Sequence, residues 1–117
     1  MAKFKIYHNP RCSKSRQTLD LLHENDADVE VIEYLKTPPT AEELTTILAS
    51  LKLSPQALMR KKEAEYQAAG LNDETLSEAQ QIQLMTENPK VIERPIVVKG
   101  KKAVIGRPPE NVLVFFK

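Results

Sequence analysis

The sequence predicts an α/β protein in which helices flank a small mixed β-sheet. Three observations lead to this prediction. Residues 3–35 have the pattern of a strand, a helix and a second strand, the middle of the chain is patterned as helices, and residues 91–117 return to strand patterns. At 117 residues, the chain is long enough for one modest core. We therefore expect a single domain over residues 1–117, with a helical insertion at about residues 40–88.

The first third of the chain is predicted to form a β-α-β unit. Residues 3–7 alternate polar and apolar side chains, as short strands do. Residues 13–25 place Leu19 and Leu22, among others, at helical spacing, and residues 29–35 are rich in the β-branched side chains that favour strands. Because a helix connects the two strands over a short distance, we expect them to pair in parallel.

Two capping-box patterns mark helix starts in the middle of the chain. Thr40 is followed three residues later by Glu43, and Ser77 is followed in the same way by Gln80. The second of these helices is predicted to run towards Glu87. Shorter helical segments are predicted at residues 56–59, after Ser54-Pro55, and at residues 61–69, before Gly70.

The last part of the chain is predicted to form a β-hairpin and a final helix. Short apolar strands at residues 96–98 and 103–105 enclose a polar turn. Pro108-Pro109-Glu110 can open a helix whose apolar side chains pack inward. The complete order is then β-α-β, helices, and β-β-α, which is the order of a thioredoxin-like domain with a helical insertion.

Composition and charge argue against several classes of protein. The 17 Lys and Arg residues nearly balance the 16 Asp and Glu residues, which disfavours binding to nucleic acid or to a membrane surface. No apolar run reaches membrane-spanning length, and the N-terminus lacks the apolar core of a signal peptide. One cysteine cannot form an internal disulfide, and no metal-ligand spacing recurs. We expect a cytoplasmic monomer that binds no metal, nucleic acid or membrane.

Cys12 is the candidate nucleophile. It lies in the predicted strand-to-helix loop, where unpaired N–H groups and the helix dipole favour a thiolate and can cradle an anion. His8, Arg11, Lys14 and Arg16 add positive or potentially positive charge nearby. A nucleophilic sulfur beside an anion site suggests chemistry on a small oxyanion. The alternative is that Cys12 is only a small buried apolar residue.

Three arginines stand out by their settings. Arg60 ends a predicted helix beside two lysines, Arg94 precedes Pro95 and an apolar strand, and Arg107 follows Gly106. Arg94 and Arg107 flank the predicted hairpin, so they can lie at one end of the sheet. The planar guanidinium group offers paired donors that suit a tetrahedral oxyanion. The alternative is that each arginine is solvated or forms a weak surface ion pair.

His8 and Ser15 are candidates for supporting a Cys12 thiolate. His8 could do so when protonated, or it could be an exposed polar residue. Ser15 can donate a hydrogen bond to the sulfur, although a serine near a helix start is usually a cap. The sequence leaves the isomer of the peptide bond before Pro95 open, because most X–Pro bonds are trans.

Seven blocks of sequence occur in a distinctive order: Ile6-Tyr7-His8-Asn9-Pro10-Arg11-Cys12 with Ser15-Arg16; Tyr34-Leu35 with Pro38-Pro39; Ala57-Leu58-Met59-Arg60-Lys61; Gly70-Leu71; Glu87-Asn88-Pro89; Arg94-Pro95-Ile96-Val97-Val98; and Gly106-Arg107-Pro108-Pro109-Glu110. Together they resemble the glutaredoxin-coupled arsenate reductases, a family with a thioredoxin-like fold and a helical insertion. The resemblance covers nearly the whole chain. It implies that Cys12 attacks arsenate, that the oxyanion is held by Arg60, Arg94 and Arg107, and that the thiolate is supported by His8 and Ser15.

The resemblance also implies a mechanism and a role in arsenic resistance. Cys12 displaces water from As(V) to form a covalent thiol–arsenate adduct, glutathione attacks the adduct, glutaredoxin resolves the mixed disulfide, and arsenite is released. Glutathione would then be a co-substrate and glutaredoxin a partner, with no bound cofactor. The single cysteine fits this scheme, because a chain without a second thiol needs an external one to complete a redox cycle.

Two other functions are compatible with the sequence. Related branches of the family bind RNA polymerase as transcriptional regulators, so the chain could be a thioredoxin-like adaptor with a remnant site. It could also be a thiol reductase that acts on another glutathione-linked substrate. The complete set of arginines favours an oxyanion-handling enzyme over an adaptor, because an adaptor does not need an oxyanion clamp.

Overall fold

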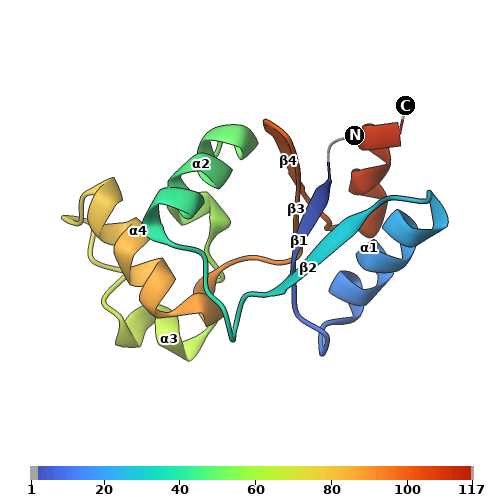
Figure 1. Cartoon of the computed structure of the whole chain (residues 1–117). Helices are drawn as coiled ribbons and strands as arrows, with labels where there is room; N and C mark the ends of the chain where they lie inside the picture. The colour runs from blue at the N-terminus through green and yellow to red at the C-terminus, as the bar shows by residue number, and fades with distance from the viewer. Residues whose placement is uncertain (1–2, 117) are drawn as a thin grey trace. The chain divides into compact units, whose positions relative to one another are not determined.

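The computed structural model describes residues 3–116. The chain divides into two compact units (Figure 1). The first, here called the sheet unit, combines the two ends of the chain, up to Thr37 and from Arg94 onward. The second, here called the helical unit, spans Pro38–Glu93 and contains the segment in which the sequence predicts inserted helices. None of the described helices has the length and apolar character needed to cross a lipid bilayer.

The sheet unit is built on a four-stranded mixed sheet. Its elements in chain order are β1 (Phe4–His8), α1 (Ser13–Glu24), β2 (Val29–Glu33), β3 (Ile96–Lys99), β4 (Lys102–Ile105) and a final 3-10 helix, η3 (Pro109–Phe116). The strand order is β2-β1-β3-β4. β1 pairs in parallel with β2 and antiparallel with β3, and β3 pairs antiparallel with β4. The predicted β-α-β unit and the predicted hairpin are therefore confirmed.

The bounds of β1, α1, β3 and β4 agree with the predicted ones to within one residue, whereas β2 and the final helix differ more. β2 ends at Glu33, two residues before the predicted end at residue 35, because the Glu33 carbonyl accepts hydrogen bonds from the N–H groups of Lys36 and Thr37 in a turn. The final helix is present after Pro108, but it is a 3-10 helix. The peptide bonds before Pro95 and Pro108 are both cis.

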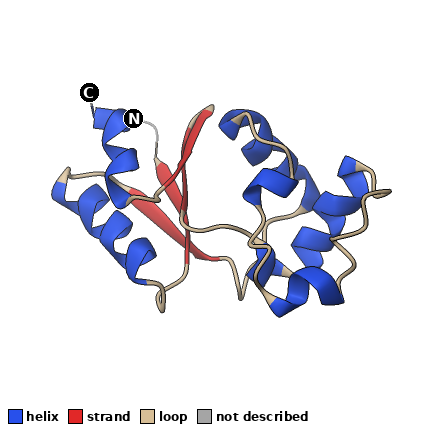
Figure 2. Cartoon of the chain, turned by 180° about the vertical axis from the view of Figure 1, so that it is seen from behind, coloured by secondary structure: helices blue, strands red, loops and turns tan. Residues whose placement is uncertain are grey.

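The core of the sheet unit lies between the sheet and two helices. α1 and η3 cover the same face of the sheet (Figure 2). The buried side chains there, each at most 4% exposed, are Phe4, Ile6, Leu22, Val97 and Val112. Phe115 adds an edge-on contact to the Phe4 ring, with ring centroids 5.4 Å apart. The final helix therefore packs inward, as predicted, and holds the C-terminal segment against β1.

The two longer helices of the helical unit, α2 (Ala41–Leu51) and α4 (Glu78–Glu87), begin where the capping-box patterns predict. The other elements of this unit are η1 (Gln56–Leu58), α3 (Ala64–Ala68) and η2 (Pro89–Val91). At the start of α2, the Thr40 hydroxyl accepts a hydrogen bond from Glu43 N–H, and the Glu43 carboxylate accepts one from Thr40 N–H. Ser77 and Gln80 form the same reciprocal pair at the start of α4. Both predicted capping boxes are confirmed.

The helix predicted at residues 61–69 is shorter than expected. The Glu63 N–H donates to the Arg60 carbonyl in a turn, and α3 begins only at Ala64. The helix ends at Ala68, one residue before the predicted end, and the predicted stop residue Gly70 has a φ of +77°, a left-handed conformation that glycine adopts without strain.

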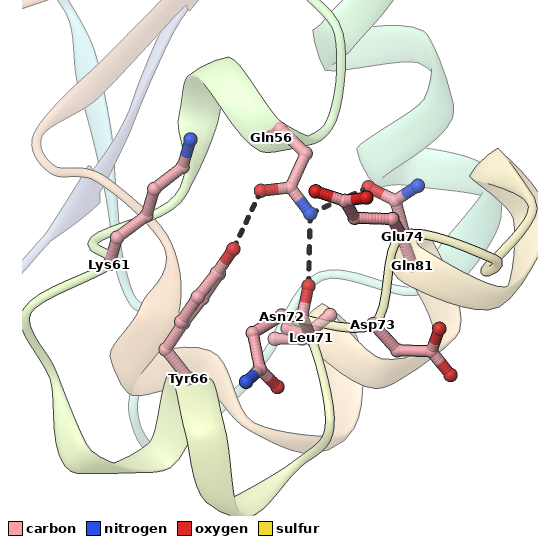
Figure 3. Close-up of a pocket in the computed structure, with 8 residues that line it drawn as sticks. All are labelled: Gln56, Lys61, Tyr66, Leu71, Asn72, Asp73, Glu74 and Gln81. Atoms are coloured by element: carbon pink, nitrogen blue, oxygen red, sulfur yellow. Dashed lines mark hydrogen bonds between the residues drawn. The ribbon is translucent and has the colours of Figure 1, made fainter.

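One amide side chain joins four segments of the helical unit (Figure 3). Gln56 Nε2 donates to the Leu71 carbonyl and to Gln81 Oε1, both at 3.1 Å, and Gln56 Oε1 accepts from the Tyr66 hydroxyl at 2.9 Å. These residues line a cavity of about 370 Å³. Because their polar groups satisfy one another, we interpret this network as a brace of the helical unit.

Gln56→Leu is expected to lower the free energy of unfolding of the full chain by about 2–3 kcal/mol, because each of the lost hydrogen bonds is worth roughly 1 kcal/mol. Urea denaturation measures this change. Gln67→Leu is the matched control, since Gln67 is exposed on α3, and it should change stability by no more than about 0.5 kcal/mol. Equal stability of the two variants would show that the brace is dispensable.

Candidate active site

The loop between β1 and α1 is ordered by its own side chains. The Asn9 side chain accepts a hydrogen bond from Arg11 N–H at 3.0 Å, and the Asn9 carbonyl accepts one from Cys12 N–H at 3.0 Å. Arg16 reaches back from α1 and donates from Nη1 to the Pro10 carbonyl at 2.8 Å. Asn9 was not among the predicted site residues, although an Asn-Pro pair is a known turn signal.

Cys12 is the N-cap residue of α1. Its backbone is extended, with φ −95° and ψ 122°, and its side chain makes no capping hydrogen bond. The sulfur is therefore left for other contacts at the positive end of the helix, where the first N–H groups have no partner within the helix. Cys12 is partly exposed, so the alternative of a fully buried apolar cysteine does not hold.

Arg107 meets the sulfur of Cys12. Its Nη2 lies 3.6 Å from Cys12 Sγ, within hydrogen-bonding distance for sulfur. Its Nε donates to the Arg94 carbonyl at 2.8 Å, which orients the guanidinium plane. Arg94 and Arg107 flank the β3–β4 hairpin and come to the same end of the sheet, as their positions in the sequence predict. A guanidinium group beside a sulfur atom at a helix N-terminus can bind an anion.

His8 and Ser15 form a buried pair under the same loop. They are 6% and 0% exposed, and His8 Nδ1 lies 2.6 Å from Ser15 Oγ. Ser15 Oγ also accepts a hydrogen bond from Asn9 N–H at 3.1 Å. The alternative that His8 is an exposed polar residue is wrong, and Ser15 is not the N-cap. The predicted action of the pair on the Cys12 sulfur stays a prediction.

Burial is the main influence on the ionisation of His8. It lowers the pKa of the imidazole below its usual value, Glu33 acts in the opposite direction, and Arg16 lowers the pKa further. The neutral imidazole is therefore the favoured form near neutral pH. In that form, Nδ1 and the Ser15 hydroxyl can share a hydrogen bond without a net charge in the interior.

This shift predicts a specific pH dependence of stability. Below about pH 6.5 the unfolded chain protonates His8 while the folded chain resists, so the unfolded state binds more protons. The free energy of unfolding should be highest above that pH and should fall as the pH drops towards the folded-state pKa. His8→Asn should flatten this decline in urea denaturation, whereas His23→Asn, at an exposed position, should preserve it. An identical pH profile for His8→Asn and the wild type would contradict the assignment.

Arg60 lies in the helical unit, whereas the other candidate residues lie in the sheet unit. Its guanidinium pairs with two carboxylates: Nη1 with Glu63, and Nε with Glu93 at 3.6 Å. The Arg60 N–H also donates to the Val91 carbonyl, so the backbone here is fixed to η2. Arg60 therefore forms partly exposed ion pairs, which is one of the two alternatives that the sequence left open, and its predicted contact with an oxyanion stays a prediction.

The structure thus brings together part of the predicted site. Cys12 and Arg107 are in contact, Arg94 holds Arg107 through its carbonyl, and His8 pairs with Ser15. Among the residues described, no group of three or more His, Cys, Asp or Glu side chains is placed to hold a metal ion. The chemistry available at this site is that of a thiol with cationic and N–H donors around it.

Comparisons with known proteins identify the family of the chain. The ArsC family matches residues 7–115. The uncharacterized protein YfgD of Escherichia coli (strain K12) is 56% identical over 110 residues, which are 93% of this chain and 92% of that protein. An arsenate reductase of Neisseria meningitidis serogroup A is 43% identical over 113 residues, or 96% and 97% of the two chains.

A solved structure shares the fold over nearly the whole chain. The arsenate reductase from Vibrio cholerae has a TM-score of 0.92 and 47% sequence identity, with 97% of each chain covered. The resemblance found in the sequence and the thioredoxin-like fold are confirmed. The chain belongs to the ArsC family.

Proposed function

We propose that the protein reduces arsenate to arsenite, with Cys12 as the nucleophile. The observation that carries the proposal is the Cys12 sulfur at the N-terminus of α1 with the Arg107 guanidinium 3.6 Å away. Relatives named arsenate reductase, at 43% and 47% identity over nearly the whole chain, support this substrate over other oxyanions.

The first step is attack by the Cys12 thiolate on the arsenic atom. A sulfur–arsenic bond forms, an arsenate oxygen leaves as water after it gains protons, and arsenic stays As(V). Arg107 and the first N–H groups of α1 stabilise the negative charge on the remaining oxygens as they rearrange. Arg94 and Arg60 are assigned to the same oxyanion by the resemblance. The pairs of Arg60 with Glu63 and Glu93 are partly exposed, so an oxyanion can compete with them.

The second step needs a thiol from outside the chain. A glutathione thiolate attacks the Cys12 sulfur, a sulfur–sulfur bond forms, and the pair of electrons from the broken sulfur–arsenic bond reduces As(V) to As(III), which leaves as arsenite. Glutaredoxin then reduces the mixed disulfide and frees Cys12. The chain has one cysteine, so it cannot supply the resolving thiol itself. We infer that the protein works in the cytoplasm, where the glutathione pool is reduced.

The experiment is NADPH oxidation in a mixture of the protein, arsenate, glutathione, glutaredoxin and glutathione reductase. Oxidation should require every one of these components, and phosphate should not replace arsenate as a substrate. Arsenite should form in proportion to the NADPH consumed. A folded protein whose thiol alkylates rapidly but that gives no arsenate-dependent oxidation would reject the proposal and indicate a different substrate for the thiol.

A further inference from the structure

The backbone segment that carries Arg107 is held at each of its carbonyl groups by a side chain. Asn111 Nδ2 donates to the Ile105 carbonyl at 3.1 Å and to the Arg107 carbonyl at 3.0 Å. The Thr18 hydroxyl lies 3.3 Å from the Gly106 carbonyl. Side chains from both η3 and α1 therefore form hydrogen bonds to the backbone of residues 105–107.

Thr18 connects this segment to the helix that begins at Cys12. It is fully buried, and its hydroxyl also donates to the Lys14 carbonyl at 2.8 Å, in the first turn of α1. A Cβ atom added to Gly106 would lie 2.5 Å from the Thr18 hydroxyl and 2.8 Å from its methyl group. The Gly106 backbone thus packs directly on α1, closer than any residue with a side chain would allow.

We propose that Thr18 and Asn111 are positioning residues that keep the Arg107 guanidinium beside the Cys12 sulfur. Neither side chain contacts the sulfur, and both act on the backbone next to Arg107. A small shift of this backbone would move the Arg107 guanidinium relative to the Cys12 sulfur. The distance between Nη2 and Sγ is already long, at 3.6 Å, so a further increase would weaken the contact. The effect on arsenate turnover rests on the proposed function, whereas the effect on the surroundings of the sulfur does not.

The charge beside the sulfur can be measured without arsenate. Cys12 is the only thiol, so alkylation by iodoacetate or iodoacetamide reports on it alone. Iodoacetate is an anion that a nearby guanidinium attracts, and iodoacetamide is neutral and similar in size. The ratio of the iodoacetate rate constant to the iodoacetamide rate constant therefore reports the positive charge near the sulfur. Changes in the exposure of the sulfur or in its thiolate fraction alter both rate constants by the same factor, so they leave the ratio unchanged.

Arg107→Ala sets the scale, with an expected fall in the ratio of about fivefold, the attraction between unit charges near contact in water. Thr18→Val preserves the shape of the side chain but removes the hydroxyl, and Asn111→Ala removes both amide donors. Each should lower the ratio by about twofold to fivefold. Thr18→Ser should restore the wild-type ratio, because it retains the hydroxyl.

Thr45→Val is the matched control. The Thr45 hydroxyl makes the same bond within a helix, to the Ala41 carbonyl at 2.8 Å, but in α2 of the helical unit. An unchanged ratio in Thr18→Val and Asn111→Ala, with a lowered ratio in Arg107→Ala, would overturn the positioning role. An unchanged ratio in Arg107→Ala would overturn it as well. Because Asn111 is exposed, Asn111→Ala should fold even if Thr18→Val does not, and it then tests the positioning role alone.

The two proposals fail in different ways. If the ratios change as expected but the wild type shows no arsenate turnover, the proposed function is wrong and the positioning role stands. If arsenate is reduced and the ratios do not respond to Thr18→Val or Asn111→Ala, the positioning role is wrong and the proposed function stands.

Discussion

Replacing Cys12 by serine is expected to lower arsenate turnover by more than about a thousandfold, because a serine hydroxyl is a far weaker nucleophile than a thiolate near neutral pH. The substitution should leave the fold intact. Cys12 is the N-cap of α1 without a capping hydrogen bond from its side chain, whereas serine is among the most favourable N-cap residues. The variant should therefore be as stable as the wild type, or more stable by about 1 kcal/mol.

Two measurements test this expectation together: arsenate-dependent NADPH oxidation and thermal unfolding. Ser13→Ala is the neighbouring control, because Ser13 is exposed at the first position of α1 and takes no part in the proposed chemistry. Turnover retained in Cys12→Ser would remove Cys12 as the nucleophile. Turnover and stability lost together would mean that the thiol is needed for the structure at this helix start.

The features that the sequence predicts well are those with local causes. Each capping box needs only two side chains within one helical turn, and Gly70 ends α3 through its own backbone conformation. The place of Cys12 at the start of α1 follows in the same way from a strand pattern and a helix pattern on either side of it. These signals do not depend on how distant parts of the chain pack.

The features that the sequence does not reveal depend on distant packing. The positions of Arg94 and Arg107 on either side of the predicted hairpin indicate that both lie at one end of the sheet. They cannot show that Arg107 contacts the Cys12 sulfur, because these two residues are 95 positions apart in the sequence. The burial of Tyr7 is similar. His8 lies on the same face of β1 as the core residues Phe4 and Ile6, as the alternating pattern predicts, whereas Tyr7 is buried on the opposite face and breaks that pattern.

Arg60 combines both situations. Its pair with Glu63 spans three residues and has a local cause, whereas its pair with Glu93 forms only because the chain returns beside η1 after α4. The isolated pairing of Met59 with Ile92 brings that return into register. A sequence pattern can identify the guanidinium as a candidate anion ligand, but not the carboxylates with which an anion must compete.

Replacing Arg107 by alanine is expected to lower kcat/KM for arsenate by about 10²–10³-fold, the range observed when one preorganised donor to a developing oxyanion is lost. The guanidinium is already oriented by its bond to the Arg94 carbonyl before any substrate binds. Arg107→Lys should recover only part of the loss, because an ammonium group retains the charge but lacks the planar fork that makes both contacts.

Arg11→Ala separates this specific role from a general attraction of anions. Arg11 is an exposed arginine in the same loop as Cys12, so its removal should cost less than about threefold in kcat/KM, and high salt should abolish that difference. If Arg107 stabilises charge that develops during the reaction, its loss should lower kcat; if it only binds arsenate, KM should rise while kcat stays unchanged. Equal, salt-sensitive losses in Arg11→Ala and Arg107→Ala would mean that the contact with the Cys12 sulfur has no part in the chemical step.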